Sequence, residues 1–311
     1  MTALSSYASW IAVDWGTSNL RLWAVAANGD IQVRLQSDKG MSALSGAAEF
    51  EAHLLQLASP YLDPDGQTDV VICGMAGARQ GWQEAGYASL PYDVSQALSY
   101  IAPQTSDRRI QPYILSGVQQ ESPADVMRGE ETQIAGFLAS HPEYTGTLCL
   151  PGTHTKWAQI SSGLITGFSS FMTGELFALI SRHSILKHDM PAQRTPQSWP
   201  DRDFLKAVKT GSEQPETVAH NLFRIRATSL VTGRSDCDAE ASLSGYLIGA
   251  ELKAASAYWQ NKQVYLLGAE PLTSHYQNAL ASMGGDASCY DAETASFDGL
   301  CQAYQAIRSM R

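Results

Sequence analysis

Two segments of the chain share the same order of features, and this pairing constrains the fold more than any other property of the sequence. Residues 11–23 and residues 148–160 each contain an apolar stretch, a turn with glycine and hydroxyl side chains, a basic residue, a tryptophan and a second apolar stretch. Apolar stretches on both sides of a short turn are typical of β-hairpins. Two such hairpins predict two lobes, each of which offers one turn to the same polyphosphate.

The turn of each hairpin has the chemistry that phosphate binding requires. Glycine lets backbone N–H groups approach phosphate oxygens, hydroxyl groups add donors, and basic side chains neutralise negative charge. Each hairpin by itself also fits an ordinary pair of strands with a polar turn, and the repetition favours phosphate binding. The predicted phosphate ligands are Gly16, Thr17, Ser18, Asn19 and Arg21 in the first hairpin and Gly152, Thr153, His154 and Lys156 in the second. For His154, donation to a phosphate and orientation of the turn stay as alternatives.

Asp14 stands at the end of the first apolar strand, directly before the turn. Mg²⁺ usually keeps several of its waters and takes few protein carboxylates. The position therefore predicts that Asp14 holds a Mg²⁺-bound water beside the polyphosphate. The cysteines have no CxxC spacing and the histidines outside the turn form no cluster, so we expect no zinc site.

Length and composition are those of a globular protein with more than one domain. The chain has 311 residues, of which 44% are hydrophobic and 17% are charged, and this length favours two domains. Its net charge is −10, with 21 Lys and Arg against 31 Asp and Glu. Contacts with nucleic acid need clustered basic residues, so this balance argues against a nucleic acid partner. A small anionic substrate needs only a local basic pocket.

The sequence has none of the usual signals for a membrane or a secretory pathway. No run of 18 apolar residues predicts a transmembrane helix, and the N-terminal residues lack the basic and apolar regions of a signal peptide. Five scattered cysteines, without the spacing of a disulfide framework, fit reduced thiols. We therefore expect a cytoplasmic protein without a membrane partner.

Hydrophobic periodicity predicts alternating strands and helices. Residues 10–36 have the alternation of a strand meander, and residues 69–73 form a buried strand followed by a glycine-rich loop at 74–82, a usual place for binding residues. Small residues at helical spacing in 244–251 predict close helix packing. Other predicted elements are a strand at 264–267 and helices at 47–58, 173–183, 218–230, 242–259, 273–283 and 295–310, the helix at 173 with Thr173 or Gly174 near its N-cap.

The order of these elements resembles the actin–hexokinase superfamily of ATP-using two-lobed proteins. A hairpin, a helix that begins with carboxylates, a second hairpin and a strand that ends in Gly-Ala before a helix follow one another in this chain. Within the superfamily, the chain resembles the 2-dehydro-3-deoxygalactonokinase family over nearly its whole length. The resembling stretches are Val13–Arg21, Met75–Gly77 with Gly81–Trp82, Met127–Gln133, Pro151–Trp157, Met172–Glu175 and Ser244–Glu251.

The resemblance implies a fold and a division into domains. The expected fold class is α/β, a two-lobed actin/hexokinase-like (ribonuclease H-like) fold in which each lobe has a mixed sheet with flanking helices and ATP lies in an interlobe cleft. The expected N-terminal lobe, with the first hairpin and the sugar-acid pocket, comprises residues 1–129. The expected C-terminal lobe, with the second hairpin and an adenosine site at Gly268 and Ala269, comprises residues 130–311. Its last helix, about 295–310, is expected to pack back on the N-terminal lobe.

The resemblance also implies an activity. A kinase of this family would transfer the γ-phosphoryl group of ATP, with Mg²⁺, to the terminal (6-) hydroxyl of 2-dehydro-3-deoxy-D-galactonate in D-galactonate breakdown. A carboxylate near the accepting hydroxyl can take its proton, and in this fold it lies near the start of a helix at the interlobe cleft. Glu131 is our first choice and Glu130 our second, because the run Arg128–Glu131 resembles the exopolyphosphatase branch, in which the second Glu of a similar pair is catalytic.

The substrate carries a carboxylate beside a ketone, so we expect an arginine in its pocket. Arg128 and Arg79 are the two arginines considered, with Trp82 as a wall of the pocket. Thr173 and Glu175 follow the second hairpin and are expected to contact nucleotide or substrate, while an N-cap role for Thr173 is the alternative.

One position departs from the superfamily pattern, and several alternatives stay open. The second hairpin usually carries an Asp before its glycine, whereas this chain has Pro151, so the magnesium site is expected to depend more on Asp14. The alternatives are a kinase of the epimer 2-dehydro-3-deoxy-D-gluconate and a non-catalytic sensor of ATP or a sugar acid. The sequence does not determine the oligomeric state, and a homodimer is one option.

Overall fold

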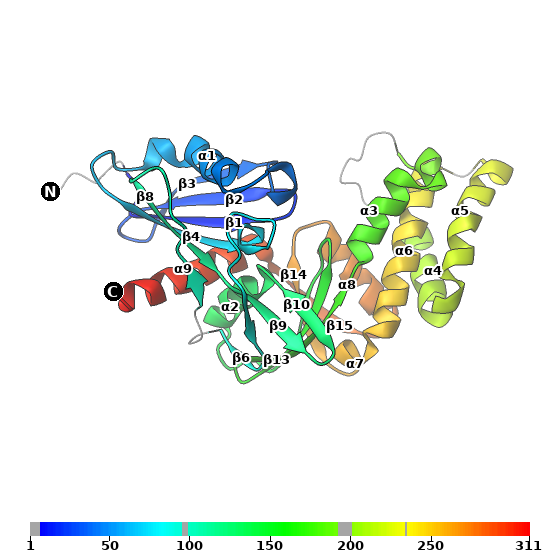
Figure 1. Ribbon diagram of the computed structural model, residues 1–311. Coiled ribbons are helices and arrows are strands. Elements are labelled where there is room, and N and C mark those ends of the chain that lie inside the picture. Colours follow the sequence, from blue (N-terminus) through cyan, green and yellow to red (C-terminus); the bar gives the residue numbers. More distant parts are fainter. Residues whose placement is uncertain (1–6, 95–98, 192–200, 234) are drawn as a thin grey trace. The chain divides into compact units, whose positions relative to one another are not determined.

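The computed structural model describes residues 7–94, 99–191, 201–233 and 235–311. The first six residues, which were part of the expectation of no signal peptide, lie outside these ranges. The chain forms two compact units, which are coloured by sequence in Figure 1. Unit 1 comprises residues 1–144, 161–166 and 293–311, and unit 2 comprises residues 145–160 and 167–292. Both combine sheets with helices, as expected of an α/β protein.

Unit 1 contains a mixed sheet of six strands in the order β3-β2-β1-β4-β8-β7. In it, β1 is antiparallel to β2 and parallel to β4, and β4 is parallel to β8. The strands are β1 (Trp10–Trp15), β2 (Leu20–Val25), β3 (Ile31–Ser37), β4 (Thr68–Gly74), β7 (Tyr100–Ile101) and β8 (Ile110–Leu115). The predicted meander at 10–36 and the predicted strand at 69–73 are therefore confirmed.

Strand β1 is buried on both faces, and its side chains alternate between two cores. Ile11 and Val13 pack with Phe50 and Leu54 of α1 (Ala47–Ala58). The alternate residues of β1, Trp10 and Ala12, pack with Leu300, Ala303 and Ile307 of α9 (Ala292–Ser309). Because successive side chains of a strand point to opposite faces, α1 and α9 cover opposite sides of the sheet (Figure 1).

Helix α9 also packs tightly against α2 (Glu130–Ser140). A Cβ atom on Gly136 would lie 1.9 Å from the carbonyl oxygen of Ala295, and one on Gly299 would lie 2.0 Å from that of Thr132. Glycine at both positions lets the two helix backbones approach closely. Because α9 packs on the sheet of unit 1, both helices group with this unit. The sequence-based division placed both in the C-terminal lobe, with the last helix packing back on the N-terminal lobe.

A second, small sheet of unit 1 has the order β10-β9-β5 and comprises β5 (Tyr87–Ser89), β9 (Gly117–Glu121) and β10 (Ala124–Met127).

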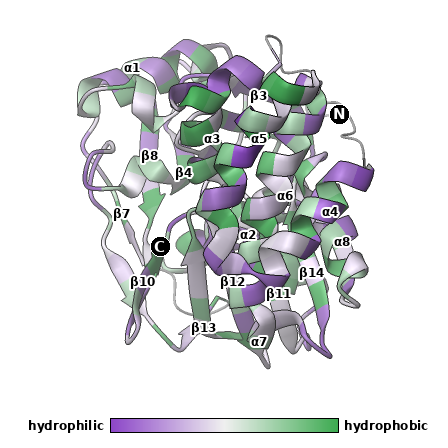
Figure 2. Ribbon diagram, turned by 90° about the vertical axis from the view of Figure 1, so that its right-hand side faces the viewer, coloured by the Kyte–Doolittle hydropathy of each residue, from purple (hydrophilic) through white to green (hydrophobic). Residues whose placement is uncertain are grey.

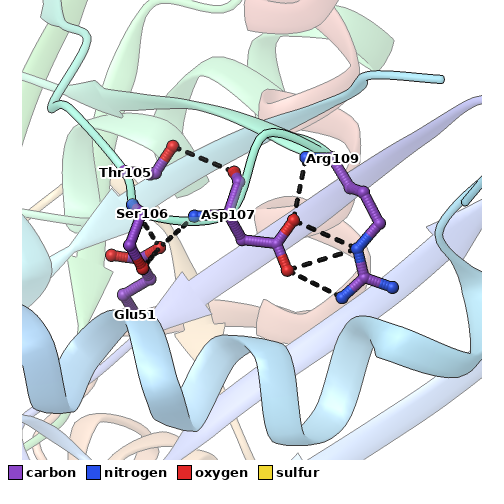
Figure 3. Close-up of polar contacts among 5 residues, drawn as sticks. All are labelled: Glu51, Thr105, Ser106, Asp107 and Arg109. Atoms are coloured by element: carbon purple, nitrogen blue, oxygen red, sulfur yellow. Dashed lines mark hydrogen bonds and ion pairs between the residues drawn. The ribbon is translucent and has the colours of Figure 1, made fainter. Parts of the chain in front are cut away.

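Elsewhere in unit 1, α1 fixes the loop before β8. The carboxylate of Glu51 accepts hydrogen bonds from the backbone N–H groups of Ser106 (2.7 Å) and Asp107 (2.9 Å) and from the Ser106 hydroxyl (2.8 Å) (Figure 3). Asp107 in turn pairs with Arg109 at 2.7 Å. This network is structural, since its groups satisfy one another.

Unit 2 is built on a mixed sheet in which the strands follow the order β15-β14-β11-β12-β13. The hairpin β11–β12 is antiparallel, and β14 is parallel to β11 and β15. The strands are β11 (Gly146–Leu150), β12 (Thr155–Ser161), β13 (Leu164–Phe171), β14 (Gln263–Gly268) and β15 (Asp286–Asp291). The first residues of β13 group with unit 1, where Ile165 pairs with Tyr92 of β6 (Tyr92–Asp93).

Helices α4, α6 and α8 cover one face of this sheet, and α3 and α5 pack on α6. Cβ atoms on Gly245 and Gly249 of α6 would lie 2.4 and 2.2 Å from carbonyl oxygens of α4, so the predicted close packing at 244–251 is confirmed. Figure 2 views unit 2 from the side of α3 and α5. The helices are α3 (Thr173–His183), α4 (Asp201–Glu213), α5 (Val218–Thr232), α6 (Asp236–Ala254), α7 (Ser256–Trp259) and α8 (Leu272–Ser282). None of the helices in the described ranges has the length and apolar character needed to cross a membrane.

Candidate active site

The first predicted phosphate turn connects β1 to β2 in unit 1. It is closed by a hydrogen bond of 2.8 Å from the Gly16 N–H to the Asn19 carbonyl oxygen. Thr17, Ser18 and Asn19 are exposed, so their donors are accessible to a ligand. Behind the turn, the N–H groups of Met41 and Ser42 donate to the carbonyl oxygens of Gly16 and Thr17 at 3.0 Å each. The loop after β3 therefore holds the turn in place.

Asp14 lies at the carboxyl end of β1, next to Cys73 of β4 in the sheet register. One of its carboxylate oxygens accepts a hydrogen bond of 3.0 Å from the Ser296 hydroxyl of α9 and lies 3.9 Å from the Arg21 guanidinium. Its side chain is 13% exposed. The predicted magnesium residue is thus partly accessible and has its orientation set by α9, although Ser296 is far away in the sequence.

Glu131 lies in the first turn of α2 and is 4% exposed. Its carboxylate accepts hydrogen bonds from the Gly129 N–H (2.7 Å) and the Thr132 hydroxyl (3.1 Å). Burial, with a further contribution from the charge of Glu130, raises the pKa of Glu131 to about 7. A carboxylate with a pKa near neutrality is well suited to general base catalysis.

Glu130, the second choice for the base, is more exposed than Glu131, and its carboxylate accepts a hydrogen bond of 2.9 Å from the Arg128 N–H. Asp14 pairs with Cys73 in the sheet, and a Cβ atom on Gly129, just before α2, would lie 3.2 Å from Cα of Gly74. Burial raises the pKa of the Cys73 thiol, and the charges of Asp14 and Glu131 raise it further. Strands β1 and β4 and helix α2 therefore bring the predicted base and the predicted magnesium residue to the same part of unit 1.

Arg128 is a buried cation whose hydrogen-bonding groups are only partly used. Its side chain is 9% exposed, one Nη donates to the Gly86 carbonyl oxygen at 2.8 Å, and its guanidinium lies 4.3 Å from the ring centre of Tyr87. Within the described residues, Nε and the other Nη have no hydrogen-bond partner. A Cβ atom on Gly77 would lie 2.7 Å from that second Nη, so the glycine-rich loop 74–82 leaves the room that Arg128 occupies.

The two other residues predicted for the substrate pocket lie in different surroundings. Trp82 is 5% exposed and belongs to the core around β1, where its ring packs edge-on against Trp15. Arg79 is exposed. Because burial and unpartnered donors distinguish Arg128 from Arg79, we retain only Arg128 as the arginine of the candidate site.

The second predicted phosphate turn, in unit 2, is tied to the start of α3. The Glu175 N–H donates to the Thr153 carbonyl oxygen at 2.9 Å, and Nε2 of His154 lies 2.5 Å from a carboxylate oxygen of Glu175. The structure therefore brings three predicted residues together. It supports the orienting role that was one of the two alternatives for His154.

Lys156 and Thr173 are both buried and both have partners inside unit 2. Nζ of Lys156 donates to the Ser170 hydroxyl at 2.6 Å, and Lys156 is 6% exposed. The Thr173 hydroxyl donates to the carboxylate of Glu251. The N-cap of α3 is Met172, and no side chain makes the capping hydrogen bond. Thr173 and Gly174 therefore lie near the cap as predicted, but the alternative N-cap role of Thr173 is wrong. Thr173 is instead the first residue of α3, and its hydroxyl donates to the buried carboxylate of Glu251.

The predicted adenosine segment follows β14. Ala269 is exposed, and its carbonyl oxygen accepts a hydrogen bond of 3.1 Å from the Leu272 N–H at the start of α8. A Cβ atom on Gly268 would lie 3.7 Å from Pro151 of the second turn. The two predicted nucleotide segments of unit 2 are thus neighbours.

The sequence did not identify Glu251 as part of a site. The residue is 3% exposed and accepts hydrogen bonds from Trp157, Thr173 and Tyr276. The signal in the sequence was a carboxylate at the end of the small and apolar stretch 244–251. On a helix face that packs in a core, a carboxylate is rare unless it has hydrogen-bond partners.

Few protein groups of this site are suited to bind magnesium. Within the described residues, no three His, Cys, Asp or Glu side chains gather in a way that could hold a metal ion. A single, partly exposed Asp14 with one oxygen engaged by Ser296 is compatible with a cation that keeps most of its waters and takes its other oxygens from phosphates.

Comparison with known proteins decides the family. The profile of the 2-keto-3-deoxy-galactonokinase family matches residues 14–303. The chain belongs to this family. The predicted family is therefore confirmed, and with it the enzyme class, a phosphotransferase with an alcohol group as acceptor that uses ATP.

Relatives of this kinase family match over almost their full length. The chain is 39% identical to a probable 2-dehydro-3-deoxygalactonokinase of Rhizobium meliloti (strain 1021), over 99% of both chains. It is 32% identical to the 2-dehydro-3-deoxygalactonokinase of Escherichia coli (strain K12), over 96% of this chain and 99% of that protein.

Solved structures confirm the fold class of this family member. A crystal structure from Sinorhizobium meliloti, described as a candidate 2-dehydro-3-deoxygalactonokinase, has a TM-score of 0.85 and 37% identity and covers 96% of both chains. The activator of 2-hydroxyisocaproyl-CoA dehydratase from Clostridium difficile, solved with bound ADPNP, has a TM-score of 0.51 and 13% identity over 97% of this chain and 96% of that chain. The second likeness concerns the fold alone, which is that of the actin/hexokinase-like ATPases.

Proposed function

We propose that this chain transfers the γ-phosphoryl group of ATP to the terminal (6-) hydroxyl of 2-dehydro-3-deoxy-D-galactonate. The names of the two curated relatives support this substrate. The observation that carries the proposal lies within the segment Arg128–Glu131, where a buried arginine with unpartnered donors stands three residues before a buried carboxylate with a pKa of about 7. One group suits a carboxylate ligand and the other suits proton transfer.

In the proposed reaction, Glu131 accepts the proton of the terminal hydroxyl as the hydroxyl oxygen attacks the γ-phosphorus. The bond between the γ-phosphorus and the oxygen of the ADP leaving group breaks, and its electrons stay on ADP. Phosphoryl transfer needs positioning and charge neutralisation more than covalent chemistry from the protein. The hydrogen bonds from Gly129 and Thr132 hold the Glu131 carboxylate in one orientation for this step.

Arg128 is proposed to bind the carboxylate of the sugar acid. A guanidinium matches a carboxylate with two parallel hydrogen bonds, and two of its nitrogens have no partner among the described residues. A buried cation without an anionic partner is unfavourable, so an anion from the substrate would complete its environment. The ring of Tyr87 fixes the guanidinium plane from one side.

The phosphate groups of ATP are proposed to contact the two turns, through Gly16 to Asn19 with Arg21 and through Gly152 and Thr153 with Lys156, while His154 is proposed to orient the second turn. Gly268 and Ala269 are proposed to contact adenosine, and Asp14 to hold Mg²⁺ through water. When bound, Mg²⁺ supplies neutralisation of phosphate charge. The oriented Asp14 carboxylate and the exposed hydroxyls of the first turn are the features of this chain that support the assignment. As a metabolic ATP-using enzyme, the protein is proposed to be cytoplasmic.

The decisive experiment measures ADP release from Mg·ATP with 2-dehydro-3-deoxy-D-galactonate, with its gluconate epimer and without an acceptor. Turnover that depends on the galactonate compound and clearly exceeds that with the epimer is the expected result. Equal rates with both compounds would indicate a broader sugar-acid kinase. Nucleotide binding without turnover on either compound would contradict the proposal and favour the sensor alternative.

The pH dependence of kcat is expected to reflect Glu131. A base with a pKa of about 7 is protonated below that pH and cannot accept a proton, so kcat should fall about tenfold per pH unit below 7. The charge of Glu130 contributes to the raised pKa. Glu130→Gln should therefore move the acidic limb of the pH–kcat profile to lower pH and keep the plateau. An unmoved limb, or loss of the plateau, would contradict these roles.

Lys156→Ala is expected to raise KM for ATP by about tenfold or more, because a buried ammonium group near the second turn would no longer neutralise phosphate charge. The Lys156 side chain also contacts Ser170. Ser170→Ala, which removes this contact and keeps the charge, is the matched control and should have a much smaller effect. Unchanged ATP affinity and turnover in the lysine variant would rule out its phosphate role.

A further inference from the structure

Glu251 is a buried carboxylate in unit 2 for which the proposed reaction has no direct use. It lies on α6 and is 3% exposed. Burial raises its pKa to about 7, although the hydrogen bonds that it accepts act in the opposite direction. Burying a carboxylate in a core is unfavourable unless hydrogen bonds satisfy its oxygens.

The partners of Glu251 come from three different elements. One carboxylate oxygen accepts from Nε1 of Trp157 on β12 at 2.8 Å. The other accepts from the Tyr276 hydroxyl on α8 at 2.8 Å and from the Thr173 hydroxyl at the start of α3. Tyr276 in turn shares a hydrogen bond of 2.9 Å with Thr155, the first residue after the second phosphate turn. Three donors on one carboxylate fix the distances between β12, α3 and α8.

Each of these elements adjoins a segment that is predicted to bind nucleotide. Strand β12 begins where the second turn ends, and α3 is tied to that turn through the hydrogen bond from the Glu175 N–H to the Thr153 carbonyl oxygen. Helix α8 follows the predicted adenosine segment at Gly268 and Ala269. The carboxylate of Glu251 therefore connects all three elements through its hydrogen bonds.

We propose that Glu251 is a positioning residue that holds the second phosphate turn, the start of α3 and the adenosine segment in the arrangement that binds the nucleotide. This inference rests on the proposed use of ATP by these segments. Glu251 itself contacts no ligand in this scheme. It acts through Thr155, Thr173 and Tyr276, and its loss is expected to change nucleotide affinity before it changes affinity for the sugar acid.

The test compares Glu251→Gln with the wild-type enzyme. Glutamine has nearly the same shape but no charge, and its amide group cannot accept hydrogen bonds from three donors. We expect the Kd for ADP, measured by calorimetry, and the KM for ATP to rise about tenfold or more, since hydrogen bonds to a charged group are strong. The KM for the sugar acid should change less than about threefold, because Arg128 and Glu131 belong to unit 1.

A matched pair of threonine variants separates positioning from a general loss of stability and covers the case in which Glu251→Gln does not fold. Thr173→Val deletes a buried hydroxyl that donates to Glu251, whereas Thr147→Val deletes a buried hydroxyl that donates to the Tyr258 carbonyl oxygen at 2.6 Å. Both should lower the melting temperature. Only Thr173→Val should also weaken ADP binding.

Three results would overturn the inference. ADP affinity could be unchanged in both Glu251→Gln and Thr173→Val, it could fall equally in Thr147→Val, or the KM values for ATP and the sugar acid could rise together. Because the ADP measurement needs no acceptor, it tests Glu251 even if the enzyme fails to phosphorylate the proposed sugar acid. Failure of the substrate assignment and failure of this inference are therefore distinguishable.

Discussion

Glu131→Gln is expected to lower kcat by about 10²-fold or more, the usual loss when a general base is removed. Glutamine keeps the size of the side chain and can still accept a hydrogen bond from the Gly129 N–H, which donates to Glu131 at 2.7 Å in the structure. It cannot take a proton from the acceptor hydroxyl. The KM for ATP should change less than about threefold, because the Glu131 carboxylate acts on the hydroxyl of the sugar acid and not on ATP.

The measurement is steady-state ADP release with saturating ATP, accompanied by a melting curve. Removing a buried charge whose pKa is raised by burial is not expected to destabilise the fold, so a large loss of kcat without a lower melting temperature is the predicted combination. A loss of less than threefold would assign the base to another residue. Glu130→Gln is the control from the same helix turn, and it should retain most of the activity at pH 8.

Arg128→Ala is expected to lower kcat/KM for the sugar acid by about 10²-fold or more. Truncating one partner of a buried, hydrogen-bonded charge pair costs about 2–5 kcal/mol, and here the other partner is the substrate carboxylate. The KM for ATP should be unaffected. In the absence of the sugar acid the variant should lose little stability, because two guanidinium nitrogens have no partner among the described residues and the buried charge is unfavourable.

Arg79→Ala is the matched control, since Arg79 was the second arginine that the sequence suggested for the substrate carboxylate. Arg79 is exposed, and we expect kcat/KM to change less than about threefold. An equal loss in both variants would contradict the choice of Arg128. A rise in the KM for ATP, with the KM for the sugar acid unchanged, would place Arg128 with the nucleotide.

Much of the fold follows from short-range patterns in the sequence. Alternation at 10–36 and helical spacing at 47–58 predicted elements that the structure contains, because side-chain periodicity is a local property. The paired Gly-Thr turns marked both hairpins for the same reason. Family motifs between Val13 and Glu251 added the order of the elements and the fold class, and the family profile matches residues 14–303.

Pairing between residues that lie far apart in sequence could not be derived in this way. The choice of Arg128 over Arg79 depends on the loop around Gly77 and on the ring of Tyr87, which bury one arginine and leave the other exposed. The N-cap prediction for Thr173 was wrong because α3 begins at Thr173 itself, whose hydroxyl donates to a carboxylate far along the chain, on α6. The assignment of α2 to unit 1 depends on glycines of two helices that meet only after folding.

The sequence by itself determined the hairpins, the helices, the family and the set of polar residues available to a phosphotransferase. These properties depend on the chemistry of neighbouring residues, so they can be recognised along the chain. Only the tertiary structure decided which of those residues are buried, which share hydrogen bonds and which pKa values are raised, as for Glu131 and Glu251. Burial and hydrogen-bond partners depend on the packing of distant segments, and this packing exists only in the folded chain.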